Sequence, residues 1–312
     1  MRRQRSVRLD VSADVEERRF RGAGALTLRA GELAATFLPD LGMTGVSLRY
    51  RGAEHFALPG GLEALRTGAT LGLPLLAPWA NRLATRRYRA GGVNVDLRGA
   101  RLTTDDNGLP MHGLLVGKPG WRIERRTTRG DTATLRAAID VDARAFPFPH
   151  RVELKITARD AQLEVATTVI PTGRRPVPVA FGWHPYLRLP RKARSKWRLR
   201  LPPRQHLELD SRGIPTGGST AEPAEAAPIG RRTFDDLYAL GRRRRLALEV
   251  DGAAIELHCA ENYPFAQVWV PPGRPFAALE PMAAPTNALV AGTTPVVPRG
   301  EAFTSTFTLA IT

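Results

Sequence analysis

The sequence predicts an all-β protein, an antiparallel sandwich or barrel, on the strength of two observations. Apolar residues alternate with polar ones in many short runs, and Gly, Pro or Asp turns separate these runs about every ten residues. The sequence also shows no regular alternation of strands and helices and no glycine-rich phosphate-binding motif, which disfavours nucleotide-binding folds. We therefore expect one domain over residues 1–312, with a basic N-terminal tail at about residues 1–20.

Several stretches carry the strand pattern clearly. In the segment 152–159, Val, Leu, Ile and Ala alternate with Glu, Lys, Thr and Arg, as in a half-buried antiparallel strand. The segment 246–259 is typical of a hairpin that turns at Asp251 and Gly252, because Asp-Gly favours a tight two-residue turn. Residues 25–39 are expected to form two strands around an Ala-Gly turn, and the chain ends in alternation over 302–312.

Helical signals are few and short. The segments 61–67 and 233–240 are the two places where a short helix is expected. Between them, residues 211–230 are rich in Gly, Ser, Pro and Ala, and this composition predicts a long surface loop.

Composition limits the classes of function. The single cysteine, Cys259, excludes an intramolecular disulfide and a thiolate metal cluster. The net charge of +16 comes largely from arginine and includes local clusters at 191–200 and 241–245. The arginines are spread along the chain without a nucleic-acid module, so we expect solvated faces and no nucleic-acid partner. No membrane-spanning run or signal peptide is recognisable, and the expected location is cytoplasmic.

Local zinc motifs are also missing from the sequence. The six histidines lie at positions 55, 112, 150, 184, 206 and 258, and no two of them fall within five residues of each other. Two histidines and a carboxylate from distant strands could still assemble a metal site, although nothing local supports one. We expect no metal and no cofactor.

Four stretches combine polar residues with apolar surroundings. Asn81 and Arg82 follow a proline-broken apolar run, and His112 precedes a glycine that allows close backbone approach. His184 and Glu280 each lie in an aliphatic segment. Taken singly, such residues more often complete a core or a surface. Taken together, they indicate a shared polar pocket, in which a Glu and a His form an acid–base pair suited to neutral pH.

The segments "PWANR", "NGLPMHG", "GWHPYL", "FDDLY" and "LEPMAAPTNA" occur in this order. As an ordered set, from about residue 25 to the end, they resemble the aldose 1-epimerase (galactose mutarotase-like) family. The resemblance implies a large antiparallel β-supersandwich with few short helices, an open sugar cleft and catalysis without a cofactor. The chain departs from galactose-specific members at Leu114, Asp236 and Leu187, and these differences leave the identity of the sugar open.

The resemblance also implies roles for individual residues. Glu280 would take the proton of the anomeric hydroxyl, and His184 would protonate the ring oxygen. His112 would hold the ring or anomeric oxygens. The sugar-binding residues would be Arg82 with Asn81 in support, Asp235 or its neighbour Asp236, and an aromatic face from Trp183 or Tyr186.

The expected function is therefore an aldose 1-epimerase that interconverts the anomers of a free monosaccharide, as a monomer or a homodimer. A hexose-6-phosphate 1-epimerase is one alternative, for which Arg66, Arg86 and Arg87 could supply positive charge at the cleft mouth. A non-catalytic sugar-binding protein on the same fold is another, although a pure binder has no need of an acid–base pair.

Overall fold

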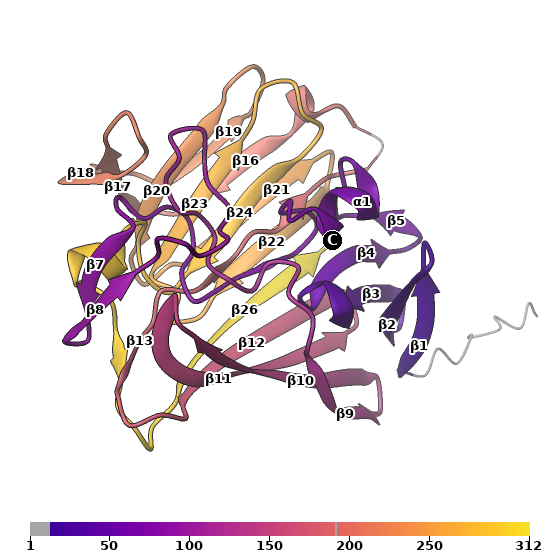
Figure 1. The fold of residues 1–312 in the computed structure, drawn as a ribbon. Coiled ribbons are helices and arrows are strands. Elements are labelled where there is room, and N and C mark those ends of the chain that lie inside the picture. The colour runs from indigo at the N-terminus through magenta and orange to yellow at the C-terminus, as the bar shows by residue number, and fades with distance from the viewer. Residues whose placement is uncertain (1–12, 191) are drawn as a thin grey trace, which may run out of the picture.

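The computed structural model describes residues 13–190 and 192–312, and these residues form mainly antiparallel sheets (Figure 1). The first sheet has its five strands in chain order, at the indigo end of the ribbon. Its strands are β1 (Asp14–Phe20), β2 (Ala23–Ala30), β3 (Leu33–Leu38), β4 (Thr44–Tyr50) and β5 (Ala53–Glu54). The predicted tail is thus wrong for residues 14–20, which pair with β2, and residues 1–12 lie outside the described part of the chain.

The largest sheet has nine strands and forms the broad band that crosses Figure 1. In spatial order its strands are β19 (Glu225–Pro228), β16 (Arg198–Leu201), β21 (Arg245–Val250), β22 (Ala253–Cys259), β26 (Phe303–Ile311), β12 (Gln162–Pro171), β11 (Phe146–Arg159), β10 (Thr132–Ala143) and β9 (Arg122–Arg129). Buried and partly exposed residues alternate along β11 and β12, so one face of each strand contributes to the core.

The third sheet carries several of the polar residues considered below, among them Glu280, Gln267 and Asp235. In spatial order its strands are β18 (Pro215–Glu222), β17 (Arg204–Leu209), β20 (Phe234–Leu240), β23 (Phe265–Val270), β24 (Ala277–Met282), β14 (Gly182–Trp183) and β6 (Leu75–Leu76), and β15 (Tyr186–Leu187) also pairs with β24. All six residues of β24 are buried, and this strand lies near the middle of the sheet, between β23 and β14.

The remaining elements are short. Two ribbons pair β7 (Arg87–Ala90) with β8 (Val93–Asp96), and β13 (Val177–Pro178) with β25 (Val296–Val297). The helices are α1 (Gly61–Arg66) and α2 (Ala288–Ala291), with 3-10 turns at Pro39–Leu41 and Arg194–Lys196. None of the helices in the described residues is long and apolar enough to cross a membrane.

The large sheet and the third sheet share a core. Trp183, on β14, is fully buried, and its indole Nε1 donates a hydrogen bond of 3.0 Å to Thr167 Oγ1 on β12. The same indole ring lies 5.8 Å from the ring of Phe307 on β26. One face of the third sheet is therefore buried against the large sheet, which leaves the opposite face free to line a cleft.

The predicted all-β class and several individual strands are confirmed. The segment 152–159 lies within β11, and residues 25–39 contain β2, a turn and β3. The hairpin of β21 and β22 turns at Asp251 and Gly252, both with positive φ, as a type I′ turn requires. The predicted helix at 61–67 is α1, and the terminal alternation is β26.

Two predictions about secondary structure are wrong. Residues 233–240 form β20 instead of a helix, because hydrogen-bonding partners flank this segment on both sides, in β17 and β23. The predicted loop at 211–230 contains β18 and β19, which lie at the edges of two different sheets. Polar edge strands look like loops in a sequence, because they bury little apolar surface.

Candidate active site

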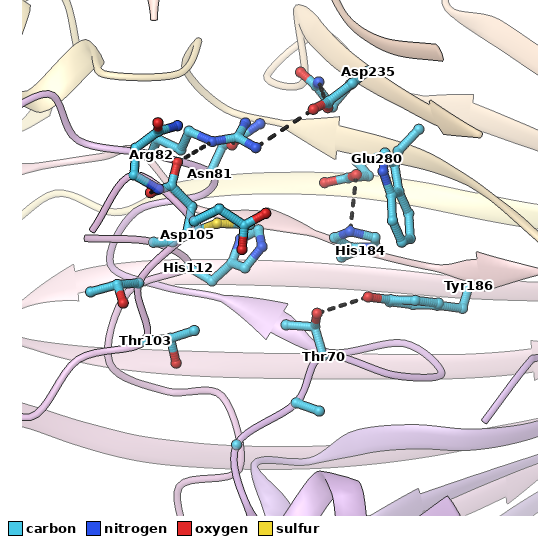
Figure 2. Close-up of a pocket in the computed structure, with 18 residues that line it drawn as sticks. Thr70, Asn81, Arg82, Thr103, Asp105, His112, His184, Tyr186, Asp235 and Glu280 are labelled. Carbon is cyan, nitrogen blue, oxygen red and sulfur yellow. Dashed lines mark hydrogen bonds and ion pairs between the residues drawn. The ribbon is translucent and has the colours of Figure 1, made fainter. Parts of the chain in front are cut away.

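A cavity of about 570 Å³ lies on the free face of the third sheet, where the loops of residues 68–70, 81–82 and 103–112 cover it. Figure 2 shows the side chains that line it, which come from segments far apart in the chain. The lining residues are Gly68, Ala69, Thr70, Asn81, Arg82, Thr103, Thr104, Asp105, Asp106, Asn107, Met111, His112, His184, Tyr186, Asp235, Gln267, Trp269 and Glu280.

Strand register explains why so many of the lining residues come from one sheet. Glu280 on β24 pairs with Gln267 on β23, and Trp269 on β23 pairs with Asp235 on β20. Since successive residues of a strand point to opposite faces, these four side chains share one face of the sheet. Tyr186 joins them, because its partner in β24 is Ala278, two residues before Glu280.

His184 and Glu280 form a buried pair in this cavity. His184 Nε2 lies 3.2 Å from Glu280 Oε1, and the two side chains are only 7% and 2% exposed (Figure 2). Burial raises the pKa of Glu280 well above its ordinary value, and burial lowers the pKa of His184 to about 3. Both shifts have the same physical cause, since burial away from solvent disfavours the charged form of either group.

The imidazole ring of His184 is fixed by its aromatic neighbours. It stacks on the ring of Tyr186 at 4.5 Å with an interplanar angle of 17°, and Trp269 contacts it edge-on at 5.5 Å. The hydroxyl group of Tyr186 is in turn hydrogen-bonded to Thr70 Oγ1 at 2.8 Å. The orientation of His184 toward Glu280 therefore depends on side chains from three different segments.

His112 lies beside the pair and is 4% exposed. Its ring meets the ring of His184 edge-on at 5.7 Å. Burial lowers the pKa of His112 well below its ordinary value, and the neighbouring His184 and Arg82 lower it further. His112 is therefore neutral near pH 7, and one of its ring nitrogens can accept a hydrogen bond while the other donates one.

The backbone at His112 is held in an unusual conformation. The φ angle of His112 is +62°, and that of Asn81 is +57°. The backbone N–H of His112 donates a hydrogen bond of 3.0 Å to the carbonyl oxygen of Asn81, which joins the loop of His112 to the loop of Asn81. The following residue, Gly113, also has a positive φ and packs directly against the carbonyl oxygen of Ala77. Non-glycine residues with positive φ are uncommon and costly, and they often occur at functional sites.

Arg82 lies at the centre of a polar network. Its Nε is 2.9 Å from Asp105 Oδ2, its Nη1 donates to Asn81 Oδ1 at 3.1 Å, and its Nη2 is 3.5 Å from Asp235 Oδ2. Burial opposes ionisation of Asp105, but backbone N–H groups and Arg82 outweigh it and lower the pKa of this carboxyl group. The carboxylate of Asp235 is also held by Gln267, whose Nε2 donates a hydrogen bond of 2.7 Å to Asp235 Oδ1.

Four buried polar atoms of the cavity have no hydrogen-bond partner in the structure: Nδ1 of His112, Nδ1 of His184, Oε2 of Glu280 and Oε1 of Gln267. Buried polar groups are nearly always hydrogen-bonded, so a cluster of such atoms indicates a place for a polar ligand. Within the described residues, no group of three His, Cys, Asp or Glu side chains is arranged to hold a metal ion.

Seven of the nine site residues expected from the sequence line this cavity: Glu280, His184, His112, Arg82, Asn81, Asp235 and Tyr186. Trp183 and Asp236 do not, and the alternation of side chains along a strand explains both corrections. Trp183 points into the core between the sheets, toward Thr167. Asp236 points away from Asp235 and accepts a hydrogen bond from the Tyr238 hydroxyl at 3.1 Å.

Other cavity residues were missed in the sequence. Gln267 is 1% exposed within the apolar strand "FAQVWV", and a polar residue in such a strand is a signal that could have pointed to it. Asp105 lies in the segment that contains His112, but nothing in the sequence pairs it with Arg82. Trp269 carries no signal that distinguishes it from a core tryptophan.

The fold and the cavity define a class of protein, a galactose mutarotase-like β-supersandwich with a polar pocket on one sheet. A galactose mutarotase-like protein from Clostridium acetobutylicum superposes with a TM-score of 0.87 at 18% identity, covering 96% of this chain and 99% of that one. A galactose 1-epimerase from Lactobacillus acidophilus NCFM gives a TM-score of 0.77 at 13% identity, with coverage of 97% and 99%. At these identities the likeness shows the fold.

The sequence itself identifies the family. The profile of the aldose 1-epimerase family matches residues 25–309, and the chain belongs to this family. Comparison with curated protein sequences gives no match. Membership supports an epimerase type of activity on a sugar, and the resemblance noted in the sequence is confirmed.

Proposed function

We propose that the protein is an aldose 1-epimerase that interconverts the α and β anomers of a free, uncharged aldose. The observation that carries this proposal is the buried pair of Glu280 and His184, which are 3.2 Å apart at the wall of a cavity of about 570 Å³. A carboxyl and an imidazole in contact can remove a proton from one oxygen of a hemiacetal and supply a proton to another.

The proton balance of the reaction fits this pair. Carboxylate Glu280 accepts the proton of the anomeric hydroxyl, and protonated His184 donates one to the ring oxygen as the bond between C1 and that oxygen breaks. Rotation about C1–C2 and the reverse transfers give the other anomer and restore both groups.

The starting state of this cycle requires only one proton on the pair. In this buried site the neutral arrangement is favoured, with the proton on Glu280, as the opposite pKa shifts of the two groups indicate. Movement of that proton across the 3.2 Å contact produces the carboxylate and the imidazolium without exchange with solvent.

The other cavity residues suit the binding of a sugar ring. Arg82 and Asp235 present charged donors and an acceptor for hydroxyl groups, and Asn81 supports Arg82 through its side-chain oxygen. In this proposal neutral His112 holds the ring or anomeric oxygens through its ring nitrogens. Tyr186 and Trp269 offer aromatic surface to the C–H face of a sugar.

The charges of the cavity favour a free aldose over a phosphorylated one. Among the described residues, Arg82 is the one Lys or Arg side chain in the lining, and two of its nitrogens already face Asp105 and Asp235. Asp106 adds a further acidic group to the lining. The arginines that would suit a phosphate, Arg66, Arg86 and Arg87, do not line the cavity.

The test is a nuclear magnetic resonance measurement of anomer exchange with glucose, galactose, xylose, arabinose and glucose 6-phosphate. We expect faster exchange for at least one free sugar, and a fall in kcat of about 10²- to 10⁴-fold in Glu280→Gln, because the amide cannot accept the proton. The exposed Glu301→Gln provides a matched control with unchanged kcat. If no sugar exchanges faster, or if Glu280→Gln retains full kcat, the proposal is wrong, and tight sugar binding without turnover would indicate a non-catalytic binder.

A further inference from the structure

A second concave surface lies at the edge of the nine-stranded sheet, and it shares no residue with the catalytic cavity. It runs across the ends of four adjacent strands, β19, β16, β21 and β22, and has a volume of about 630 Å³. We call it the arginine groove. Its lining residues are Arg200, Leu201, Pro202, Pro203, Ala224, Glu225, Ala226, Arg242, Arg243, Arg244, Arg245, His258 and Cys259.

The acidic residues near the groove are already engaged. Glu225 is contacted by Arg204 and Arg232 from outside the groove, at 3.2 and 2.6 Å. Glu256 faces Arg200 and His258. The positive charge of the remaining arginines is therefore only partly compensated by the protein itself.

Three consecutive arginines lack acidic partners within the described residues. Arg242 and Arg243 are exposed and take part in none of the ion pairs found there. Arg244 is partly buried, and its Nε atom is shielded from solvent without a hydrogen-bond partner. A desolvated donor on a cationic side chain costs free energy unless an acceptor is supplied, so the described residues leave the hydrogen-bonding capacity of Arg244 incompletely used.

High arginine content alone does not produce this arrangement. Another concave surface, near β1 to β4, is also lined by arginines, but the guanidinium groups of those arginines have acceptors nearby. Arg18 and Arg29 face Glu16, while Arg19 and Arg49 donate to the carbonyl oxygens of Gly22 and Gly52. The arginine groove differs because its guanidinium groups remain available.

We propose that the arginine groove binds a small phosphorylated molecule, with the phosphate at Arg242, Arg243 and Arg244. Guanidinium groups match the oxygens of a phosphate through paired hydrogen bonds. Leu201, Pro202 and Pro203 give the groove an apolar wall for the carbon body of the ligand. Its volume is in the range of small-molecule sites, whereas a nucleic acid would need a longer basic track.

The experiment is isothermal titration calorimetry of the full-length protein with inorganic phosphate and with phenyl phosphate, at low and at high chloride. We expect the wild type to bind phenyl phosphate more tightly than phosphate. In the double variant Arg242→Gln/Arg243→Gln the Kd for phenyl phosphate should rise at least about tenfold, because charged hydrogen bonds are lost.

The control is Arg125→Gln/Arg129→Gln, which removes the same charge from exposed positions on β9. We expect its Kd to stay within about twofold of the wild type, since long-range charge effects are screened by salt. Equal weakening in both variants, no binding of phenyl phosphate, or preferred binding of duplex DNA would overturn the proposal. Anomer exchange in the groove variant should equal that of the wild type, so this result and the test of the epimerase proposal are independent.

Discussion

His184 and Glu280 lie in direct contact, 3.2 Å from imidazole Nε2 to carboxyl Oε1, on adjacent segments of the third sheet. Burial shifts their pKa values in opposite directions, upward for Glu280 and downward for His184. Each shift favours the uncharged form, so the neutral arrangement of the pair, with its proton on the carboxyl group, is favoured over the pair of charges.

The first prediction concerns the pH dependence of stability. Folded Glu280 keeps a proton that the unfolded chain releases above about pH 4.5, so its contribution to the free energy of unfolding falls as pH rises toward the folded pKa. His184 has the opposite effect between about pH 3 and 6.5, where this residue is protonated in the unfolded chain but not in the folded protein. In that range its contribution to the free energy of unfolding rises with pH. Above pH 6.5 the effect of Glu280 remains alone.

Urea denaturation of the wild type and Glu280→Gln at pH 6.5, 7.5 and 8.5 checks this sign. The free energy of unfolding of the wild type should fall relative to that of the variant by up to about 1 kcal/mol per pH unit, because the amide has no proton to lose. All other titrating groups are common to both proteins and cancel in the difference. A pH-independent difference would show that Glu280 is ionised in the folded state.

Local strand patterns could be predicted from the sequence, and long-range pairings could not. Residues 246–259 turn at Asp-Gly, and residues 152–159 alternate strictly, so both predictions depended on neighbouring residues alone. In residues 233–240 the spacing of Phe234, Leu237 and Tyr238 suits a helix equally well. That segment is a strand because β17 and β23 lie on either side of it, and no local signal reports those partners.

The same limit applies to the site. The polar residues in apolar segments, including His184 and Glu280, could be found because burying such groups is costly without a reason. Which of two adjacent residues faces the cavity depends on strand register, and a slip of one residue reverses the answer. For this reason the sequence left Asp235 and Asp236, and likewise Trp183 and Tyr186, as alternatives.

The second prediction separates the two aspartates. Asp235 faces the cavity, between Gln267 and Arg82, while Asp236 faces the Tyr238 hydroxyl. In Asp235→Asn we expect KM for the preferred aldose to rise about tenfold, since a charged hydrogen-bond acceptor is lost. Asp236→Asn should leave KM within about twofold of the wild type, and an equal rise in both variants would contradict the assigned register.

The third prediction concerns discrimination against phosphorylated sugars. Asp105 compensates the charge of Arg82 at 2.9 Å, and its carboxylate also accepts the N–H groups of Asn107 and Leu109. Asp105→Asn keeps an oxygen acceptor for that turn and leaves Arg82 with less negative charge beside it.

Dividing kcat/KM for a sugar 6-phosphate by kcat/KM for the same sugar without phosphate gives a measure of this preference. We expect Asp105→Asn to raise this ratio by about tenfold, because one negative charge is removed from a partly buried site. The exposed Asp131→Asn changes net charge equally and should leave this ratio unchanged. Steady-state rates from polarimetry at constant ionic strength give both values. The same ratio in wild type and Asp105→Asn would show that cavity charge does not set this preference.

The last prediction tests the loop that presents His112. A Cβ on Gly113 would lie 2.2 Å from the carbonyl oxygen of Ala77, which accepts the N–H groups of Leu114 and Leu115. Gly108 has nearly the same φ, +73° against +72°, but a Cβ there meets nothing within 4 Å. Gly108→Ala therefore measures the strain of the left-handed backbone alone, about 1 to 2 kcal/mol.

Gly113→Ala should lower the free energy of unfolding by a further 2 kcal/mol or so, because the contact is with backbone that must shift. It should also reduce kcat more than Gly108→Ala does, since His112 is the preceding residue. Equal losses of stability in the two variants would mean that the close approach to Ala77 relaxes without cost.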